Sequence, residues 1–222
     1  MRVINKVLAG TAAVGLAATM AACSSSGGSS SKPVKEGAFT TLTGNSTTVI
    51  PDPGFVAALG KLKVTPGLVG KASMANGGFS FPITGGHATI YKPGTTAKGT
   101  PYVQGEIDHM GSGLSLTAGG IKVELTNFVV DPGNNSKLTG DVSANGKSVV
   151  KGAKLFDLDG STLKAPSISG GVATLQGTTI YLSTAAAGLL NSTYKLTGAN
   201  ALKGGNKTGV KIGTAVIKAT GK

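Results

Sequence analysis

The sequence is short of several residue types that metal sites, disulfide frameworks and catalytic centres require. Its 222 residues include one cysteine, two histidines and no tryptophan. A single cysteine excludes an internal disulfide and every zinc or iron–sulfur site built from several cysteines. Only nine acidic side chains are present, so few groups are available for general acid–base catalysis. The composition therefore favours a binding or structural role over an enzymatic one, and it predicts no metal.

Basic side chains outnumber acidic ones by 21 to 9, for a formal net charge of +12. Arg2 and Lys6 lie in an N-terminal segment that we expect to be removed, and every other basic residue is a lysine. Bidentate recognition of guanine or phosphate favours arginine, so we expect no nucleic-acid partner. The scattered lysines are typical of a soluble β surface with protected edges. Attraction to anionic lipid headgroups or wall polymers is the functional alternative.

Residues 1–22 are typical of a secretory signal, with Arg2 and Lys6 ahead of an apolar run over 7–20. Met-Ala-Ala-Cys at the end of this segment resembles a bacterial lipobox. The resemblance predicts cleavage between Ala22 and Cys23 and acylation of Cys23, the only cysteine. Several acyl chains anchor a protein without a membrane span, so we expect a lipid-anchored protein on the extracytoplasmic face of the cell membrane. An ordinary signal peptide followed by an incidental cysteine is the other interpretation.

Residues 23–37 are rich in serine and glycine and are predicted to form a flexible tether. No Pro/Ser-rich boundary divides residues 38–222, so one domain is the simpler interpretation. Glycine-rich turns there separate short runs in which apolar and polar residues alternate, as at Ile121, Val123 and Leu125. This pattern is typical of antiparallel sheets. We therefore predict a mainly β fold: a single antiparallel β-sandwich or barrel-like domain with one or two short helices.

Two segments carry helix signals within this β pattern. Asp52 can cap a helix over residues 53–62, which opens on a proline. Ser183 or Thr184 can cap a second helix over residues 185–191. We expect both helices to pack against the sheet as accessories.

Two asparagines mark expected irregularities in the strands. The alternation breaks at Asn127, which predicts a β-bulge or a strand buried on both faces. Asn145 precedes Gly146 between two alternating runs, which predicts a hairpin turn. Residues 141–148 also nearly match a phosphate-binding loop, but Gly140 stands one residue too early for that motif. We therefore favour the hairpin.

Residues 155–163 resemble the signature of haloacid-dehalogenase phosphatases, with Asp157 in the place of the nucleophile and Asp159 in that of the general acid. No Asp or Glu follows Asp159, so the later carboxylates that hold Mg²⁺ in that family are missing. The same two carboxylates could begin a calcium loop, but the glutamate that completes an EF-hand loop is also absent. We expect a strand that ends in an Asp-Gly turn.

A serine hydrolase would need a serine, a histidine and an acid close together in space. Asp108, His109 and Ser112 are close in sequence, but no Gly-x-Ser-x-Gly elbow accompanies them. An envelope hydrolase is therefore the third of our functional hypotheses.

A longer resemblance is carried by Phe-Ser-Phe-Pro-Ile at 79–83, by the run Gly-Glu-Ile-Asp-His-Met-Gly-Ser-Gly-Leu-Ser-Leu at 105–116, and by strands at 123–130 and 138–142. In this order they are similar to the HtaA-type domain of actinobacterial secreted and surface proteins, a β-rich family implicated in haem uptake. The chain also resembles a broader set of uncharacterised actinobacterial lipoproteins. The resemblance implies a β fold, an envelope location and haem as a possible cofactor. His109 matches the family's histidine, and no tyrosine matches its axial ligand.

Our leading hypothesis is a lipid-anchored envelope protein that binds a ligand or partner, or contributes structurally, without catalysis. The alternative is haem binding or relay in iron acquisition, with His109 and Tyr102 as ligand-binding residues. These two residues are seven positions apart, so a regular strand places them on opposite faces. A bulge between them would be needed to bring both to one ligand.

Overall fold

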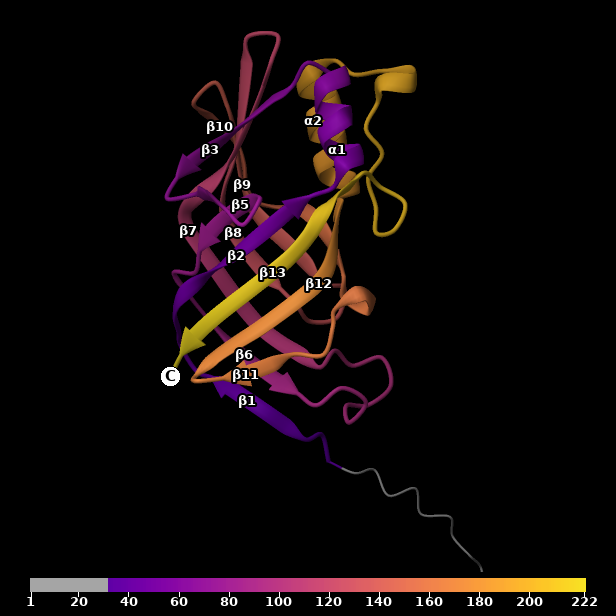
Figure 1. Cartoon of the computed structure of the whole chain (residues 1–222). Helices are drawn as coiled ribbons and strands as arrows, with labels where there is room; N and C mark the ends of the chain where they lie inside the picture. Colours follow the sequence, from indigo (N-terminus) through magenta and orange to yellow (C-terminus); the bar gives the residue numbers. More distant parts are fainter. Residues whose placement is uncertain (1–31) are drawn as a thin grey trace, which may run out of the picture. The chain divides into compact units, whose positions relative to one another are not determined.

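The alternating runs fold into strands along most of the chain (Figure 1). The computed structural model describes residues 32–222, so the signal segment and the predicted cleavage and acylation at Ala22 and Cys23 lie outside the described residues. Within residues 32–222, 13 strands join one antiparallel sheet. The strands are β1 (Lys35–Phe39), β2 (Leu42–Pro51), β3 (Thr65–Gly70), β4 (Ser73–Ala75), β5 (Gly78–Pro82), β6 (Gly85–Tyr91), β7 (Val103–Ala118), β8 (Ile121–Asp131), β9 (Lys137–Ala144), β10 (Lys147–Asp159), β11 (Ser167–Ser169), β12 (Val172–Leu182) and β13 (Lys211–Gly221).

The strands follow the order β1-β6-β7-β8-β9-β10-β12-β13-β2-β5-β4, with β11 added to β12 and β3 added to β7. The two ends of this order meet where β5 runs into β6. There the amide of Ile83 donates to the carbonyl of Asn45 on β2 at 2.7 Å, and the amide of Thr84 donates to that of Asp108 on β7 at 2.8 Å. The sheet therefore curls on itself, and its inner face encloses the apolar core.

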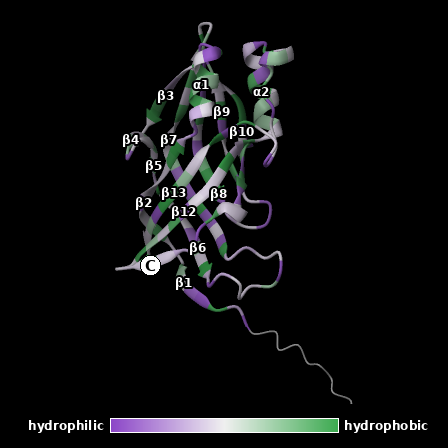
Figure 2. Ribbon diagram, turned by 45° about the vertical axis from the view of Figure 1, so that its right-hand side comes forward, coloured by the Kyte–Doolittle hydropathy of each residue, from purple (hydrophilic) through white to green (hydrophobic). Residues whose placement is uncertain are grey.

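The hydropathy of the strands explains this curvature. Hydrophobic and hydrophilic residues alternate along much of the sheet, so most of the long strands have one apolar face (Figure 2). On β7, for example, Val103, Ile107 and His109 are buried, whereas Glu106 and Met110 between and after them are exposed. An antiparallel sheet with one apolar face must cover that face, and curling achieves it. The predicted fold class is confirmed.

Both predicted helices are present, and they lie at the same end of the sheet (Figure 1). Helix α1 spans Pro53–Lys61, and the Asp52 side chain accepts from the amide of Gly54 as the predicted cap. Helix α2 spans Thr184–Tyr194, three residues beyond the predicted end, and Ser183 is the cap. Neither helix in the described part of the chain is long and apolar enough to cross a membrane.

The predicted bulge at Asn127 is confirmed. The β8–β9 register shifts between Thr126 and Val129, and Asn127 has a left-handed φ of 54°. A second shift interrupts the β7–β8 register between His109 and Gly113. The Asn127 side chain joins the two irregularities, because its Oδ1 accepts from the amide of Gly111 at 3.0 Å.

Hydrogen bonds that begin at Asn127 extend to the next two strands, β9 and β10. The Nδ2 of Asn127 donates to Asp141 on β9 at 2.9 Å, and the other carboxylate oxygen of Asp141 accepts from the amide of Gly152 on β10 at 3.0 Å. Gly152 also has a left-handed φ, 61°. One asparagine and one aspartate therefore join irregularities on β7, β8 and β10.

The remaining local predictions concern turns and boundaries. Asn145 and Gly146 form the β9–β10 hairpin with φ values of 48° and 77°, as the sequence predicts for a two-residue turn. Asp159 ends β10 and caps the short 3-10 helix η1 (Gly160–Thr162). Strand β1 begins at Lys35 and pairs with β6, so the last residues of the predicted tether, 35–37, belong to the sheet.

Candidate functional site: an apolar cavity with a buried histidine

The inner face of the sheet and the two helices enclose a cavity of about 130 Å³. The residues that line it come from α1, α2 and eight strands. In the described part of the chain, none of these lining residues has a charged side chain. The apolar lining includes Val49, Phe55, Leu59, Phe79, Phe81, Leu116, Leu125, Phe128, Val130, Leu138, Phe156, Leu158, Ile180, Leu190, Ile212 and Ile217. Protein interiors are normally packed with few voids larger than a water molecule, so a cavity of this size is a candidate ligand site.

His109 is the most polar group in the lining. It lies on β7 with 1% of its surface exposed, and its Nε2 is 2.8 Å from the Oγ1 of Thr47 on β2. Its Nδ1 has no hydrogen-bond partner in the described part of the chain. Burial lowers the pKa of His109 from 6.5 to about 4, although the backbones of Phe128 and Ile107 oppose the shift. The imidazole is therefore neutral at physiological pH.

The strand pattern explains why this histidine faces the interior. The β6–β7 register is regular up to Asp108, so His109 continues the inward face of Val103 and Ile107. The β7 bulge comes after His109. Ser112, fully buried within it, donates from its Oγ to the carbonyl of His109 at 3.1 Å. The bulge thus fixes the backbone beside His109 without turning its side chain away.

Two phenylalanines complete the wall around the His109–Thr47 pair. Phe128 is the cross-strand partner of His109, and Phe81 is that of Thr47. The two rings meet edge to face, with centroids 5.2 Å apart and an interplanar angle of 79°. This geometry is the favoured one for an aromatic pair. The polar pair therefore sits in a surface that is otherwise aromatic and aliphatic.

The lining is more exposed near the helices. Phe55 and Leu62 beside α1, and Tyr194, Leu196 and Leu202 at and after the end of α2, are half-buried, whereas His109 and its neighbours are buried. We call these five half-buried residues the rim of the cavity. His109 and Thr47 form its floor.

Side-chain bonds hold the rim together. The hydroxyl of Tyr194 donates to the carbonyl of Leu116 on β7 at 2.6 Å, which links α2 to the sheet. The Asn191 amide bonds the backbone of Leu202 twice, accepting from its N–H at 2.8 Å and donating to its carbonyl at 2.9 Å. Asn191 thereby holds the segment after α2 against the helix, and Tyr194 holds the helix against β7.

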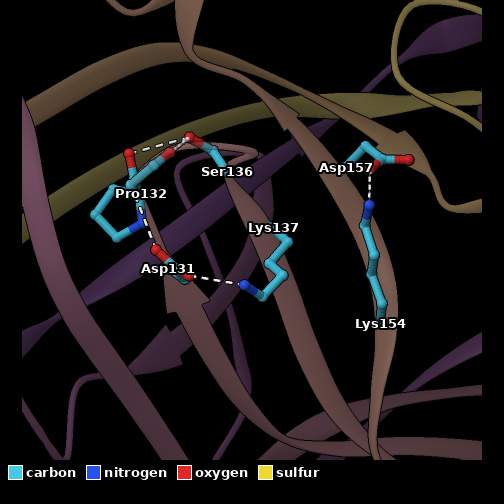
Figure 3. Close-up of polar contacts among 7 residues, drawn as sticks. Asp131, Pro132, Ser136, Lys137, Lys154 and Asp157 are labelled. Carbon is cyan, nitrogen blue, oxygen red and sulfur yellow. Dashed lines mark hydrogen bonds and ion pairs between the residues drawn. The ribbon is translucent and has the colours of Figure 1, made fainter. Parts of the chain in front are cut away.

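The β8–β9 turn also borders the cavity, through Pro132 and Ser136. Ser136 donates to the carbonyls of Pro132 at 3.0 Å and Gly133 at 2.7 Å, and Asp131 pairs with Lys137 at 2.8 Å (Figure 3). Burial alone would raise the pKa of the Asp131 carboxyl, but Lys137 and the amide of Gly133 hold it below its ordinary value. This turn is a rigid part of the wall.

The structure does not bring Tyr102 to His109. The hydroxyl of Tyr102 donates to the carbonyl of Leu163 at 2.7 Å, and Tyr102 is not among the residues that line the cavity. The bulge that could have united the two lies after His109 rather than between them. Of the two ligand-binding residues predicted from the sequence, only His109 lies at the cavity. Thr47 was missed, because nothing in its local sequence distinguishes it from other strand threonines.

The hydrolase-like and phosphatase-like motifs have other contacts. Ser112 bonds the main chain of His109 rather than its imidazole, so the two are not arranged as nucleophile and base. Asp157 pairs with Lys154 (Figure 3), and Asp159 accepts from the amide of Ser161 at 3.0 Å. Among residues 32–222, no group of three or more His, Cys, Asp or Glu side chains could hold a metal ion.

Asp159 in addition lies 3.3 Å from the Nζ of Lys207, through its second carboxylate oxygen. Burial alone would raise the pKa of Asp159, but hydrogen bonds from Ser161 and the Lys207 ammonium hold it below its ordinary value. Both carboxylate oxygens are thus occupied by contacts within the chain. They stabilise the turn after β10.

Neither the protein-family models nor the curated proteins include a match to this sequence. Among solved structures, the fold is similar to the C-terminal domain of HtaA from Corynebacterium glutamicum, with a TM-score of 0.52 and 16% sequence identity. The similarity covers 81% of this chain and 98% of that domain. A domain-swapped dimer of a histidine-to-alanine variant of the same domain matches with a TM-score of 0.44 and 16% identity, over 75% of this chain and 89% of that one. The fold is therefore HtaA-like.

Proposed function

We propose that this domain is a non-enzymatic binding protein that holds a small apolar ligand in the cavity between the curved sheet and the two helices. The observation that carries the proposal is the cavity itself: about 130 Å³ of space without a charged side chain in the described lining. At about 24 cal/mol per Å³, an empty cavity of this volume destabilises the fold by roughly 3 kcal/mol. A ligand that fills it would recover much of that free energy.

The predicted location indicates where the ligand would be bound. Acylation at Cys23 would hold the domain at the extracytoplasmic face of the membrane, on the tether that precedes β1. The ligand would then be met in the envelope rather than in the cytoplasm. The lysines would favour approach to anionic headgroups or wall polymers, an attraction that salt weakens.

Haem is the alternative ligand, through the resemblance to the HtaA-type domain. One observation favours it: Nδ1 of His109 has no partner, and an imidazole nitrogen can ligate haem iron. The cavity is smaller than haem. A cavity of about 150 Å³ holds one benzene molecule, and haem has four pyrrole rings, whereas this cavity is about 130 Å³. Haem bound at His109 would therefore require the rim of the cavity to open.

Calorimetric titration of the full chain with toluene tests the proposal. We expect saturable binding near one equivalent and a higher melting temperature in its presence. Two alanines on α1 supply a matched pair of variants: Ala58 lines the cavity, and Ala57 is exposed. Ala58→Phe should narrow the cavity and weaken binding, and Ala57→Phe should leave it unchanged.

Absence of saturable toluene binding to the folded wild-type chain would overturn the proposal. Equal weakening of toluene binding by Ala58→Phe and Ala57→Phe would show that toluene binds outside the cavity. Haemin is titrated in parallel, beside His109→Ala. A saturable Soret shift that depends on His109 would establish the alternative, and would require the rim to open in solution.

A further inference from the structure

The floor of the cavity contains a polar group whose hydrogen-bonding capacity is half used. The imidazole of His109 has two nitrogens, and Thr47 occupies one of them at 2.8 Å. The other, Nδ1, is buried and without a partner in the described residues. A buried polar atom left unsatisfied destabilises the folded state, and each such atom in a protein calls for an explanation. A ligand group that reaches Nδ1 would supply the missing partner.

The charge of the surroundings restricts what that group can be. No charged side chain is among the described residues that line the cavity, and the side chain that bonds the imidazole is the neutral hydroxyl of Thr47. An ionised carboxylate or an ammonium placed here would lose its water without gaining a counter-ion, which is strongly unfavourable. The polar end of the ligand is therefore neutral.

The tautomer of His109 further restricts the polar group of the ligand. If Nε2 donates to Thr47, Nδ1 is an acceptor; if the Thr47 hydroxyl donates to Nε2, Nδ1 carries the proton and is a donor. A hydroxyl group can serve either arrangement, because it both donates and accepts. A ketone or an ether can only accept, so it suits one tautomer alone.

From these three constraints we infer that the cavity takes a neutral, apolar alcohol or phenol, with its hydroxyl at the His109–Thr47 floor and its apolar body toward the rim. This inference rests on the proposed function, since it specifies the ligand class of the same site. It also assigns His109 a role in specificity rather than in catalysis or metal ligation. The aromatic edges of Phe81 and Phe128 beside the floor suit a phenol ring in particular.

Phenol and toluene provide the test, because they differ by a hydroxyl in place of a methyl group. Their dissociation constants are measured with the full wild-type chain, with His109→Leu and with His109→Gln. Comparing the phenol-to-toluene ratio between proteins cancels the different hydration of the two probes. In His109→Leu we expect the ratio to shift against phenol by about tenfold, the loss typical of one buried hydrogen bond. His109→Gln retains a donor and an acceptor, and it should restore part of the preference.

A control and a direct readout accompany the titrations. His87 is exposed on β6, outside the lining, so His87→Leu should leave the ratio unchanged. In the wild-type chain, phenol should shift the ¹⁵N resonance of the His109 Nδ1 and leave those of His87 in place, whereas toluene should shift neither strongly. This second measurement keeps the test decisive where His109→Leu does not fold.

The possible results distinguish failure of the inference about the hydroxyl from failure of the proposed function. Binding of toluene and phenol with a ratio that His109→Leu does not change, and with no ¹⁵N shift, would overturn the inference and leave an apolar cavity that binds without selecting a hydroxyl. Binding of neither probe would overturn the proposed function itself. Displacement of phenol by benzoate at neutral pH would also contradict the inference, because it would show that the floor accepts an anion.

Discussion

His109 and Thr47 are 62 positions apart in the chain, and their side chains meet at 2.8 Å across the interior of the curved sheet. Strands β7 and β2 are not neighbours in the sheet order, so this contact exists only because the sheet curls. It places a neutral imidazole at the floor of an apolar cavity. Its consequences for stability and binding can be measured.

The burial of His109 predicts a defined pH dependence of the free energy of unfolding. Its pKa is about 4 in the folded protein and 6.5 in a model peptide, so between these values the unfolded state binds more protons. Stability is therefore fully present above pH 6.5 and is lost as the pH falls toward 4. At pH 5 the expected loss is about 2 kcal/mol relative to pH 7.

Urea denaturation at several pH values measures this loss. In His109→Phe the slope between pH 6.5 and 5 should disappear, and in His87→Phe it should remain. The carboxyls of Asp52, Asp131, Asp141 and Asp159, whose pKa values are lowered from 3.8, add their own loss of stability only below about pH 5, outside this window. A wild-type slope that survives in His109→Phe would contradict the assignment to His109.

Asn127 should stabilise the bend of the sheet through its side chain and its backbone together. Asn127→Ala removes the bonds to Gly111 and Asp141 and places alanine at a φ of 54°, so we expect a loss of about 2–3 kcal/mol in the free energy of unfolding. Asn127→Gly removes the same bonds without the backbone strain and should lose about 1 kcal/mol less. Chemical denaturation of the two variants separates the two contributions. Equal losses would show that strain at this position is unimportant.

Tyr194 should control access to the cavity. Tyr194→Phe deletes the 2.6 Å hydrogen bond to Leu116 and leaves a carbonyl without its partner, so we expect about 1 kcal/mol of destabilisation. Toluene should also enter faster, because the link between α2 and β7 is gone, and NMR exchange measurements report that rate. Tyr91→Phe is the control, since Tyr91 lies on β6 and is not among the residues that line the cavity. An unchanged entry rate in Tyr194→Phe would show that the ligand passes elsewhere.

Cys23→Ala should release the protein from the membrane. Without the thiol there is no site for acylation, and the remaining tether of serine and glycine offers no apolar anchor. Fractionation of cells that express the wild type and the variant measures the distribution, and Ser24→Ala is the matched control. Acylation of Cys23→Ala at the wild-type level would contradict the lipobox prediction.

The features predicted correctly from the sequence are those whose cause is local. Asn145 and Gly146 accept left-handed φ values, so they form a hairpin wherever two strands flank them. Asp52 ahead of a proline caps α1 for an equally local reason. The break in alternation at Asn127 predicted a bulge or a strand buried on both faces, and the register shift there shows the bulge. The sequence placed the end of α2 too early. The residues directly after Asn191 are polar, so they gave no sign that the helix continues to Tyr194, which bonds to β7.

The candidate site was only partly predictable. His109 was singled out because it matches the histidine of the HtaA-type domain, but its place beside Phe128 and Phe81 depends on two other strands. Tyr102 was grouped with it by proximity in sequence, and the structure assigns its hydroxyl to Leu163 instead. The cavity could not be predicted at all, because a void is a property of how side chains from many elements fail to fill a volume.

The sequence by itself determined the strand pattern, the turns and the near absence of arginine and acidic side chains, because these depend on residue type and on neighbours along the chain. It also determined which face of β7 carries His109, since side chains alternate along a strand. Only the tertiary structure decided that Thr47 would meet His109 and that Nδ1 would be left without a partner. The reason is physical: long-range contacts depend on how far the sheet curls, and that curvature is the joint result of bulges and packing on many strands.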